Sequence, residues 1–377
     1  MEQKNQDHEI SEHIKVSVIL PVCNPGSGIE RCIKSLREQT LREIEMIFVD
    51  DCGTDDTMEK VHAAAKEDPR IRIIRNEKNS GPGFSRNAGI EAARGEYLQF
   101  TDPDDFMDAE YLEELYRYAC EKKLDLVKGK FVYELADGSQ VFKKRVNDRI
   151  KKRYTRGYPL FTLLAQHQSI LVRRSILMKY HIRYGESYCG QDTTFLMRFG
   201  CADLSFDICE TTGFYHYVYR DNSLSNELSE KNLLGRLDAL REQVDFLLSG
   251  KFDVYAEDVL LKRTRYMLLR HSGASSVPEL KETSETFFKG ICEQVMRCPL
   301  SDDLIKNNLD IRGLVKYGEN LSLKPYTTPF HKPGMGEYLR RWLHIAGFIC
   351  RHPSEFPAVF SEFFQIIQRK LAEKMQM

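Results

Sequence analysis

A regular alternation of strand-like and helix-like segments between residues 15 and 101 limits what this chain can fold into. Four apolar runs rich in β-branched residues have the length of strands, at residues 15–22, 44–49, 71–74 and 96–101. Helix signals fill the segments between them, at residues 28–39, 54–67 and 84–93. Such alternation predicts a mostly parallel sheet covered by helices on both faces, which binds ligands beyond the carboxyl ends of its strands.

The chain after residue 108 is less regular. We expect a helix at 109–123, a hairpin of 125–135 with 140–146 about Asp137 and Gly138, and helices from about residue 229 onward, for instance 233–248 and 259–269. The expected fold class is therefore α/β, with a Rossmann-like, mostly parallel sheet followed by a helical C-terminal region.

The composition narrows the class of partner. The chain has 55 Lys and Arg against 56 Asp and Glu, so no overall field would attract nucleic acid. The first residues are polar and acidic, and no run of about 18 apolar residues occurs that could span a membrane. The 10 cysteines form no C-x-x-C pair, which is typical of reduced thiols. We expect a cytoplasmic protein that binds no nucleic acid.

Acidic residues follow two of the predicted strands. Asp50 and Asp51 come after the second strand, while Asp102, Asp104 and Asp105 come after the fourth. Parallel strands bring both groups to the same edge of the sheet, and two carboxylates at i and i+2 in extended chain can face one side. Such hard oxygen donors suit Mg²⁺ or Mn²⁺ together with diphosphate oxygens and water. The alternative is a solvated Asp-Pro turn whose acids cap the helix at 109–123.

The phosphate-binding glycine loops of other nucleotide-binding folds are absent. No G-x-G-x-x-G follows the first strand, and no G-x-x-x-x-G-K-[ST] occurs in the chain. A metal ion would then have to hold the phosphates.

Five ordered motifs resemble one family. They are 18–24 (VILPVCN), Leu36 with Gln39 and Thr40, 49–55 (VDDCGTD), 79–89 (NSGPGFSRNAG) and 100–105 (FTDPDD). Together they resemble inverting family 2 glycosyltransferases of the GT-A fold, of the bacterial polysaccharide-assembly kind, over residues 14–225. The resemblance implies a polar extension at 1–13, a GT-A domain at 14–226 with a donor half at 14–108 and an acceptor half at 109–226, and a helical region at 227–377.

The resemblance also implies roles on the donor side. Pro21 and Cys23 would line the pocket for the base, and Cys23 stands where the family usually has Tyr. Asp50 would accept a hydrogen bond from the base. Asp102 would lie near the ribose and the metal, and Asp104 would be the principal metal ligand.

Arg86 is implied as a contact for the diphosphate or the donor sugar, unless it is a solvated residue on the helix surface. The family's Glu-Asp pair corresponds to Gln191 and Asp192. An inverting transfer needs one carboxylate that takes the proton of the acceptor hydroxyl, and we expect Asp192 to be this base. The alternative is that Asp192 only caps the helix that follows.

Residues 215–225 (YHYVYRDNSLS) resemble a family segment that closes over the diphosphate. The resemblance implies that Arg220 and Ser223 hold the diphosphate. His216 could reach the metal, or it could be a packed, hydrogen-bonded histidine.

Two segments outside the resemblance carry further hypotheses. Residues 143–156 contain eight basic residues against the single acid Asp148, which fits either a solvated loop or a dock for an anionic, lipid-linked acceptor. Leu339, Trp342 and Ile349 lie on one apolar helix face, which either packs on its own domain or contacts the inner membrane surface peripherally.

The resulting prediction is a metal-dependent inverting glycosyltransferase. It would move a sugar from a nucleoside-diphosphate donor, with UDP expected from the family, to a saccharide or lipid-linked acceptor in surface polysaccharide synthesis. Two alternatives stay open. One is a catalytically silent, sugar-nucleotide-binding assembly subunit, which Cys23, Cys52 and Gln191 would favour. The other is a nucleotidyltransferase, which would not need a base as far downstream as Asp192.

Overall fold

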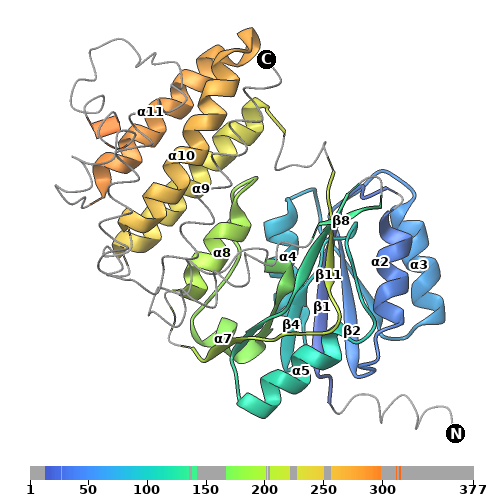
Figure 1. Cartoon of the computed structure of the whole chain (residues 1–377). Coiled ribbons are helices and arrows are strands. Elements are labelled where there is room, and N and C mark those ends of the chain that lie inside the picture. Colours follow the sequence, from blue (N-terminus) through green and yellow to red (C-terminus); the bar gives the residue numbers. More distant parts are fainter. Residues whose placement is uncertain are drawn as a thin grey trace, which may run out of the picture. The chain divides into compact units, whose positions relative to one another are not determined.

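The structure is a computed structural model. It describes residues 13–26, 28–135, 138–141, 167–200, 202, 204–220, 227–249, 256–298, 311 and 314–315. All of these residues belong to one compact unit, Met1–Pro325, whose elements are labelled in Figure 1.

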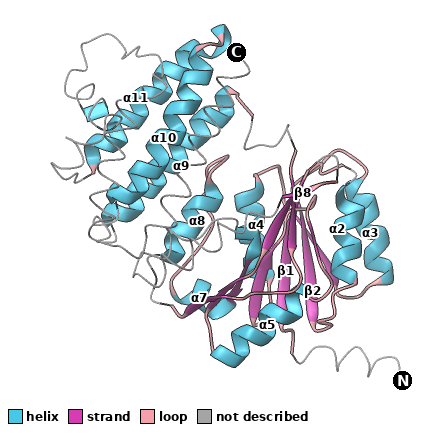
Figure 2. Cartoon of the chain, in the orientation of Figure 1, coloured by secondary structure: helices cyan, strands magenta, loops and turns pink. Residues whose placement is uncertain are grey.

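The main sheet is mostly parallel and, in the described part of the chain, has seven strands (Figure 2). In spatial order they are β10 (Phe206–Ile208), β6 (Leu126–Lys128), β9 (Ile170–Arg173), β4 (Tyr97–Phe100), β1 (Val16–Val22), β2 (Ile44–Asp50) and β3 (Ile71–Arg75). Strands β4, β1, β2 and β3 run parallel, whereas β9 is antiparallel to both of its neighbours. These four parallel strands are the four runs predicted from the sequence.

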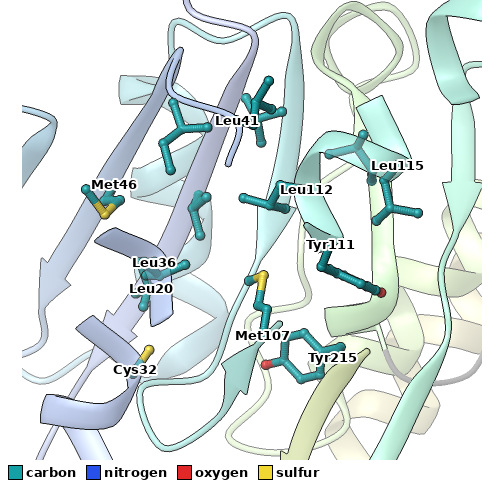
Figure 3. Close-up of a cluster of buried hydrophobic side chains, with 14 of the residues drawn as sticks. Leu20, Cys32, Leu36, Leu41, Met46, Met107, Tyr111, Leu112, Leu115 and Tyr215 are labelled. Carbon is teal, nitrogen blue, oxygen red and sulfur yellow. The ribbon is translucent and has the colours of Figure 1, made fainter. Parts of the chain in front are cut away.

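Two buried layers hold helices against the faces of this sheet. Every residue of β1 and β2 is buried, which explains their continuous apolar sequence. Val18 and Leu20 pack in one layer with α2 (Gly28–Arg37), α3 (Thr57–Glu67) and α5 (Tyr111–Lys122), part of which Figure 3 shows. Ile19, between them, faces the other layer, which contains α4 (Pro82–Ala92), α7 (Arg174–Lys179) and α8 (Gln191–Gly200). The predicted covering of both faces is therefore confirmed.

A smaller sheet of four strands lies within the described residues. Its order is β5 (Phe106–Met107), β11 (Tyr215–Val218), β7 (Phe131–Glu134) and β8 (Gln140–Val141). The antiparallel pair of β7 and β8 is the predicted hairpin, with Gly138 at a φ of 78°. Residues 142–146 of the expected second strand lie outside the described residues.

The prediction of a single strand at 125–135 is wrong. The chain leaves the main sheet after β6 and enters the smaller sheet at β7, so two strands replace one. Gly129 makes the crossing possible, because a Cβ at this position would overlap the Tyr111 hydroxyl group.

Three long helices follow, namely α9 (Glu230–Ser249), α10 (Ala256–Ser275) and α11 (Lys281–Arg297). They share an apolar core that includes Leu237, Phe287 and Ile291. Helix α9 also contacts α8, where the Gln243 amide donates to the Thr194 hydroxyl at 3.1 Å. The helical stretches predicted at 233–248 and 259–269 are thus present, while the domain boundary near residue 226 stays a prediction. Among the described helices, none combines the length and apolar character that crossing a membrane requires.

Candidate active site

A cavity of about 780 Å³ lies beyond the carboxyl ends of β1, β2 and β4. Its walls come from segments far apart in the sequence, namely residues 21–25, 51, 79–86, 102–104, 133, 167–168, 188–193, 217–220, 231–236 and 263–266. Parallel sheets bind ligands at this edge, because the loops after the strands are free to vary there. A second cavity, of about 590 Å³, lies over α2 and α3, and none of the predicted site residues lines it.

Most of the predicted site residues meet in the first cavity. Those that line it are Pro21, Cys23, Arg86, Asp102, Asp104, Asp192 and Arg220. Asp50 and His216 do not line it, and Ser223 lies outside the described residues. The basic run at 143–156 and the C-terminal apolar face at 339–350 also lie outside the described residues.

Asp51, rather than Asp50, reaches the cavity wall after β2. The Asp51 carboxylate accepts hydrogen bonds from the Asn76 amide at 2.8 Å and from the backbone N–H groups of Ser80 and Gly81 at 2.9 and 2.8 Å. It therefore fixes the loop that leads into α4. The Asp50 carboxylate accepts from the backbone N–H of Cys52 at 3.0 Å, which holds the turn after β2.

Cys23 lies at the end of the cavity beside β1. The Asn79 amide lies 3.2 Å from its sulfur, and Asn24, with a φ of 51°, accepts hydrogen bonds from the N–H groups of Thr54 and Asp55. Burial raises the pKa of the Cys23 thiol, and the charge of Asp51 acts in the same direction. The Cys23 thiol is therefore uncharged, and its small side chain lines the cavity at the position predicted to contact the base.

Arg86 and Asp102 form an ion pair inside the cavity wall. Arg86 Nη2 lies 2.5 Å from Asp102 Oδ1, and the Gln168 amide donates to Asp102 Oδ2 at 2.7 Å. Burial alone would raise the pKa of Asp102, but the Arg86 charge holds it below its ordinary value. Arg86 itself is only 4% exposed, so it is not the solvated surface residue that one interpretation of the sequence allowed.

Asp104 has a different environment from Asp102. Burial and the nearby charge of Asp102 raise its pKa, although Arg220 pairs with its carboxylate. Asp105 is turned away from the cavity, because its carboxylate accepts from the Tyr215 hydroxyl at 2.7 Å and from the Val218 N–H at 2.8 Å. Asp105 thus ties the loop after β4 to β11 and leaves Asp102 and Asp104 at the cavity.

The structure does not bring His216 to the cavity. Its ring stacks on Phe106 with the centroids 4.1 Å apart, and its Nε2 lies 3.0 Å from the Asp108 carboxylate. This arrangement favours the interpretation in which His216 is a packed, hydrogen-bonded histidine rather than a metal ligand.

Asp192 lies in the first turn of α8 and faces the cavity. Among the described residues, its carboxylate receives one hydrogen bond, from the neighbouring Thr193 hydroxyl at 3.4 Å. The N–H groups of Thr193 and Thr194 bond to Gly190 instead. Asp192 is therefore not a helix cap, and its carboxylate is available to a ligand.

A divalent metal ion fits the donor set that Asp102 and Asp104 provide. No group of three or more His, Cys, Asp and Glu side chains that could hold a metal occurs among the described residues. These two carboxylates would therefore need further oxygen ligands, which a diphosphate and water supply. A cation would also relieve the like-charge repulsion that raises the pKa of Asp104.

Several cavity residues were not predicted from the sequence. His167 is buried, both of its ring nitrogens lack a hydrogen-bond partner within the described structure, and burial lowers its pKa to about 4. Lys231, Arg236, Arg263 and Tyr266 come from α9 and α10. No motif marks these residues, because charged positions on an amphipathic helix are usually solvated.

The fold and the site define an α/β protein with a cavity at the carboxyl edge of a mostly parallel sheet, and comparison with known proteins narrows this class. The family model for glycosyl transferase family 2 matches residues 17–181. TarP, the poly(ribitol-phosphate) beta-N-acetylglucosaminyltransferase of Staphylococcus aureus, is 30% identical over 228 residues, which are 59% of this chain and 68% of TarP. The chain therefore belongs to glycosyl transferase family 2 and is a glycosyltransferase by family membership.

Other relatives match over different shares of their length. EpsH of Bacillus subtilis, a putative glycosyltransferase, is 29% identical over 65% of this chain and 72% of its own length. The glycosyltransferase GlyG of Streptococcus pneumoniae is 35% identical over 34% of this chain, but the match spans only 42% of GlyG.

A solved structure shows the same fold. Residues 1–349 of S. aureus TarS, in complex with UDP-GlcNAc, superpose with a TM-score of 0.58 at 21% identity, covering 82% of this chain and 91% of that one. The expected GT-A fold with a helical C-terminal region is therefore confirmed.

Proposed function

We propose that this protein transfers a sugar from a nucleoside-diphosphate donor to an acceptor hydroxyl group, with inversion at the anomeric carbon. The observation that carries the proposal is the single cavity that contains Cys23, the pair Asp102 and Asp104, and Asp192. These residues supply, in order, a wall for the base, oxygen ligands for a metal, and a carboxylate that is free to take a proton.

The donor is assigned to the half of the cavity beside β1 and β4. Pro21 and Cys23 contact the base, and Arg86 orients Asp102 beside the diphosphate. Asp102 and Asp104 would hold Mg²⁺ or Mn²⁺, and such an ion would neutralise the charge that develops on the departing diphosphate. Arg220 pairs with Asp104 and lines the cavity, so its guanidinium can bind the diphosphate when a donor enters.

The transfer is a single displacement. The acceptor oxygen forms a bond to the anomeric carbon while the bond from that carbon to the diphosphate oxygen breaks on the opposite face. The Asp192 carboxylate takes the hydroxyl proton as the new bond forms, so the products are a glycoside, a nucleoside diphosphate and one proton. His167 and Arg86 line the same cavity and help to exclude water.

The relatives support a UDP-sugar and an acceptor in surface polysaccharide synthesis. The TarS structure contains UDP-GlcNAc, and TarP is named for transfer of N-acetylglucosamine to poly(ribitol-phosphate). For this chain, our proposal therefore includes a UDP-sugar donor and a saccharide or lipid-linked acceptor. It also includes a cytoplasmic location with peripheral contact at the inner membrane face.

A thermal-shift panel tests the donor site. UDP, GDP, CDP and TDP are added with and without Mn²⁺ to the wild type, to Asp104→Ala and to the surface control Asp238→Ala on α9. We expect one nucleotide to raise the midpoint temperature only with Mn²⁺, and this shift to vanish in Asp104→Ala but not in the control. If no nucleotide gives a metal-dependent shift, the proposed donor site is wrong.

Product analysis separates the reaction classes. Turnover that releases a nucleoside diphosphate supports glycosyl transfer, whereas release of pyrophosphate would indicate a nucleotidyltransferase. A donor that binds and stays intact with every acceptor would indicate a silent binding subunit.

A further inference from the structure

Helices α9 and α10 add a basic wall to the cavity, formed by Lys231, Arg236 and Arg263. These helices begin after residue 181, where the match to the family model ends. The aromatic rings of Tyr188 and Tyr266 lie beside the three cations and line the same cavity. The helical region therefore contributes directly to the site.

Two cations of this basic wall, Lys231 and Arg236, lie beside aromatic rings. Arg236 Nε donates to the Asn232 amide oxygen at 2.7 Å, and its guanidinium lies 5.0 Å from the Tyr266 ring centroid. Lys231 Nζ lies 3.9 Å from the centroid of Tyr188. Arg263 lines the cavity and makes no hydrogen bond or ion pair within the described part of the chain. Arg263 thus faces the cavity without a carboxylate at hydrogen-bond distance among the described residues.

Arg263 and Asp192 line the same cavity, and their charges interact. Burial lowers the pKa of Arg263, the charge of Asp192 opposes this effect, and the charge of Arg236 adds to it. Asp102 and Asp104 instead pair with Arg86 and Arg220. The ion pairs of Arg86 and Arg220 are therefore with Asp102 and Asp104 rather than with Asp192.

Packing fixes the basic wall relative to Asp192. A Cβ at Gly190 would come within 3.1 Å of the Ala239 side chain, so α9 lies directly against the start of α8. The bond between Gln243 and Thr194 joins the same two helices. A ligand group bound to Arg236 on α9 is consequently held at a fixed position relative to the proposed base on α8.

We propose that the basic wall binds a phosphate group of the acceptor and thereby places the neighbouring acceptor hydroxyl at Asp192. Three cations beside one carboxylate favour an anion over a neutral saccharide, and paired arginine forks match phosphate oxygens. A polyol-phosphate polymer and a lipid-linked saccharide diphosphate both carry a phosphate group that could bind in this way. This inference rests on the proposed function, because it assigns the acceptor side of the same cavity.

The test compares the double variant Arg236→Gln/Arg263→Gln with the wild type and with Arg241→Gln. Arg241 is an exposed residue of α9 that pairs with Asp238, so it controls for loss of charge on the same helix. The probes are a ribitol-phosphate oligomer and a short-chain lipid diphosphate carrying N-acetylglucosamine. Free ribitol and free N-acetylglucosamine are their uncharged counterparts. Binding is measured by calorimetry on the full chain, and UDP with Mn²⁺ is titrated separately.

We expect at least one phosphorylated probe to bind the wild type, and the one that binds more tightly identifies the source of the phosphate. The double variant should weaken this binding roughly ten- to a hundredfold, as the loss of charge-assisted hydrogen bonds predicts. Arg241→Gln should bind the probe as the wild type does, and UDP affinity should be the same in all three proteins.

Two results would overturn the proposal. One is that no phosphorylated probe binds more tightly than its uncharged counterpart. The other is that the double variant loses affinity for UDP as much as for the probe, which would assign the basic wall to the donor diphosphate. Failure of the proposed donor site has a different signature, because UDP would then show no metal-dependent binding even to the wild type.

Discussion

The Arg86 guanidinium donates to the Asp102 carboxylate at 2.5 Å, and the two residues come from α4 and from the loop after β4. This ion pair joins the motif at 79–89 to the motif at 100–105 inside the cavity wall. Arg86 is 4% exposed, so neither charge is well solvated without the other. The pair therefore supports both the fold and the donor site.

Replacement of Arg86 by Met should destabilise the protein and weaken UDP binding. The half-buried Asp102 would keep a charge without its partner, which costs about 3 kcal/mol in the free energy of unfolding. Urea titration measures this change, and the exposed Arg241→Met should cost less than about 1 kcal/mol. In Arg86→Met/Asp102→Asn the loss should be smaller than the sum of the two single losses. Strict additivity would contradict a coupled pair.

Asp51→Asn should loosen the loop before α4. The Asp51 carboxylate accepts three hydrogen bonds, and an Asn amide would turn an NH₂ group toward at least one of those donors. We expect a loss of about 2 kcal/mol in the free energy of unfolding, together with weaker UDP binding. The exposed Asp56→Asn is the matched control. Unchanged stability in Asp51→Asn would show that this loop is not held by the carboxylate.

Asp192→Asn should separate catalysis from donor binding. An amide cannot take the acceptor proton, so kcat should fall by about 10²- to 10⁴-fold while the Kd for UDP with Mn²⁺ stays the same. Release of nucleoside diphosphate measures the rate, and Asp238→Asn controls for the loss of an acidic residue. If Asp192→Asn turned over at the wild-type rate, another group would have to be the base.

The donor half of the site could be predicted because its determinants are local. Strands β1 and β2 are buried on both faces, and this gives apolar runs that are visible in the sequence. Parallel pairing carries strand ends to the same edge, so the sequence predicts that the acidic residues after the second and fourth strands lie together. The contact between Arg86 and Asp102 was not predicted, because Arg86 was named only through the family resemblance. The choice between Asp50 and Asp51 could not be made in this way, because it depends on the turn at Cys52, which has a φ of 60°.

The acceptor half depends on contacts between distant segments. His216 was a candidate metal ligand, but its partners Asp108 and Phe106 belong to a strand pairing that no local pattern reveals. Arg236 and Arg263 lie on helices whose charged residues resemble a solvated surface. Only the packing of α9 against α8 turns these charges toward the cavity.

The buried Lys128 side chain leads to a prediction about how the free energy of unfolding depends on pH. It lies at the end of β6, is fully buried, and its Nζ donates to the Ser169 hydroxyl at 2.6 Å. Ser169 closes the short 3-10 helix His167–Ser169, which carries two cavity residues. Burial lowers the pKa of Lys128 from 10.5 to about 7. A charged lysine therefore opposes folding at this position.

The sign of the pH dependence follows from these values. Between pH 7 and about 10.5 the unfolded chain binds a proton at Lys128 that the folded chain lacks, so the free energy of unfolding rises with pH. Lys128→Met removes this dependence. The variant should be more stable than the wild type at pH 7, by on the order of a few kcal/mol, and the difference should shrink toward pH 10. Urea titrations of both proteins at pH 7, 8.5 and 10 measure the trend, with the exposed Lys34→Met as control. A difference that is constant across this range would show that Lys128 keeps its ordinary pKa, and that a charged lysine is stabilised beside the cavity.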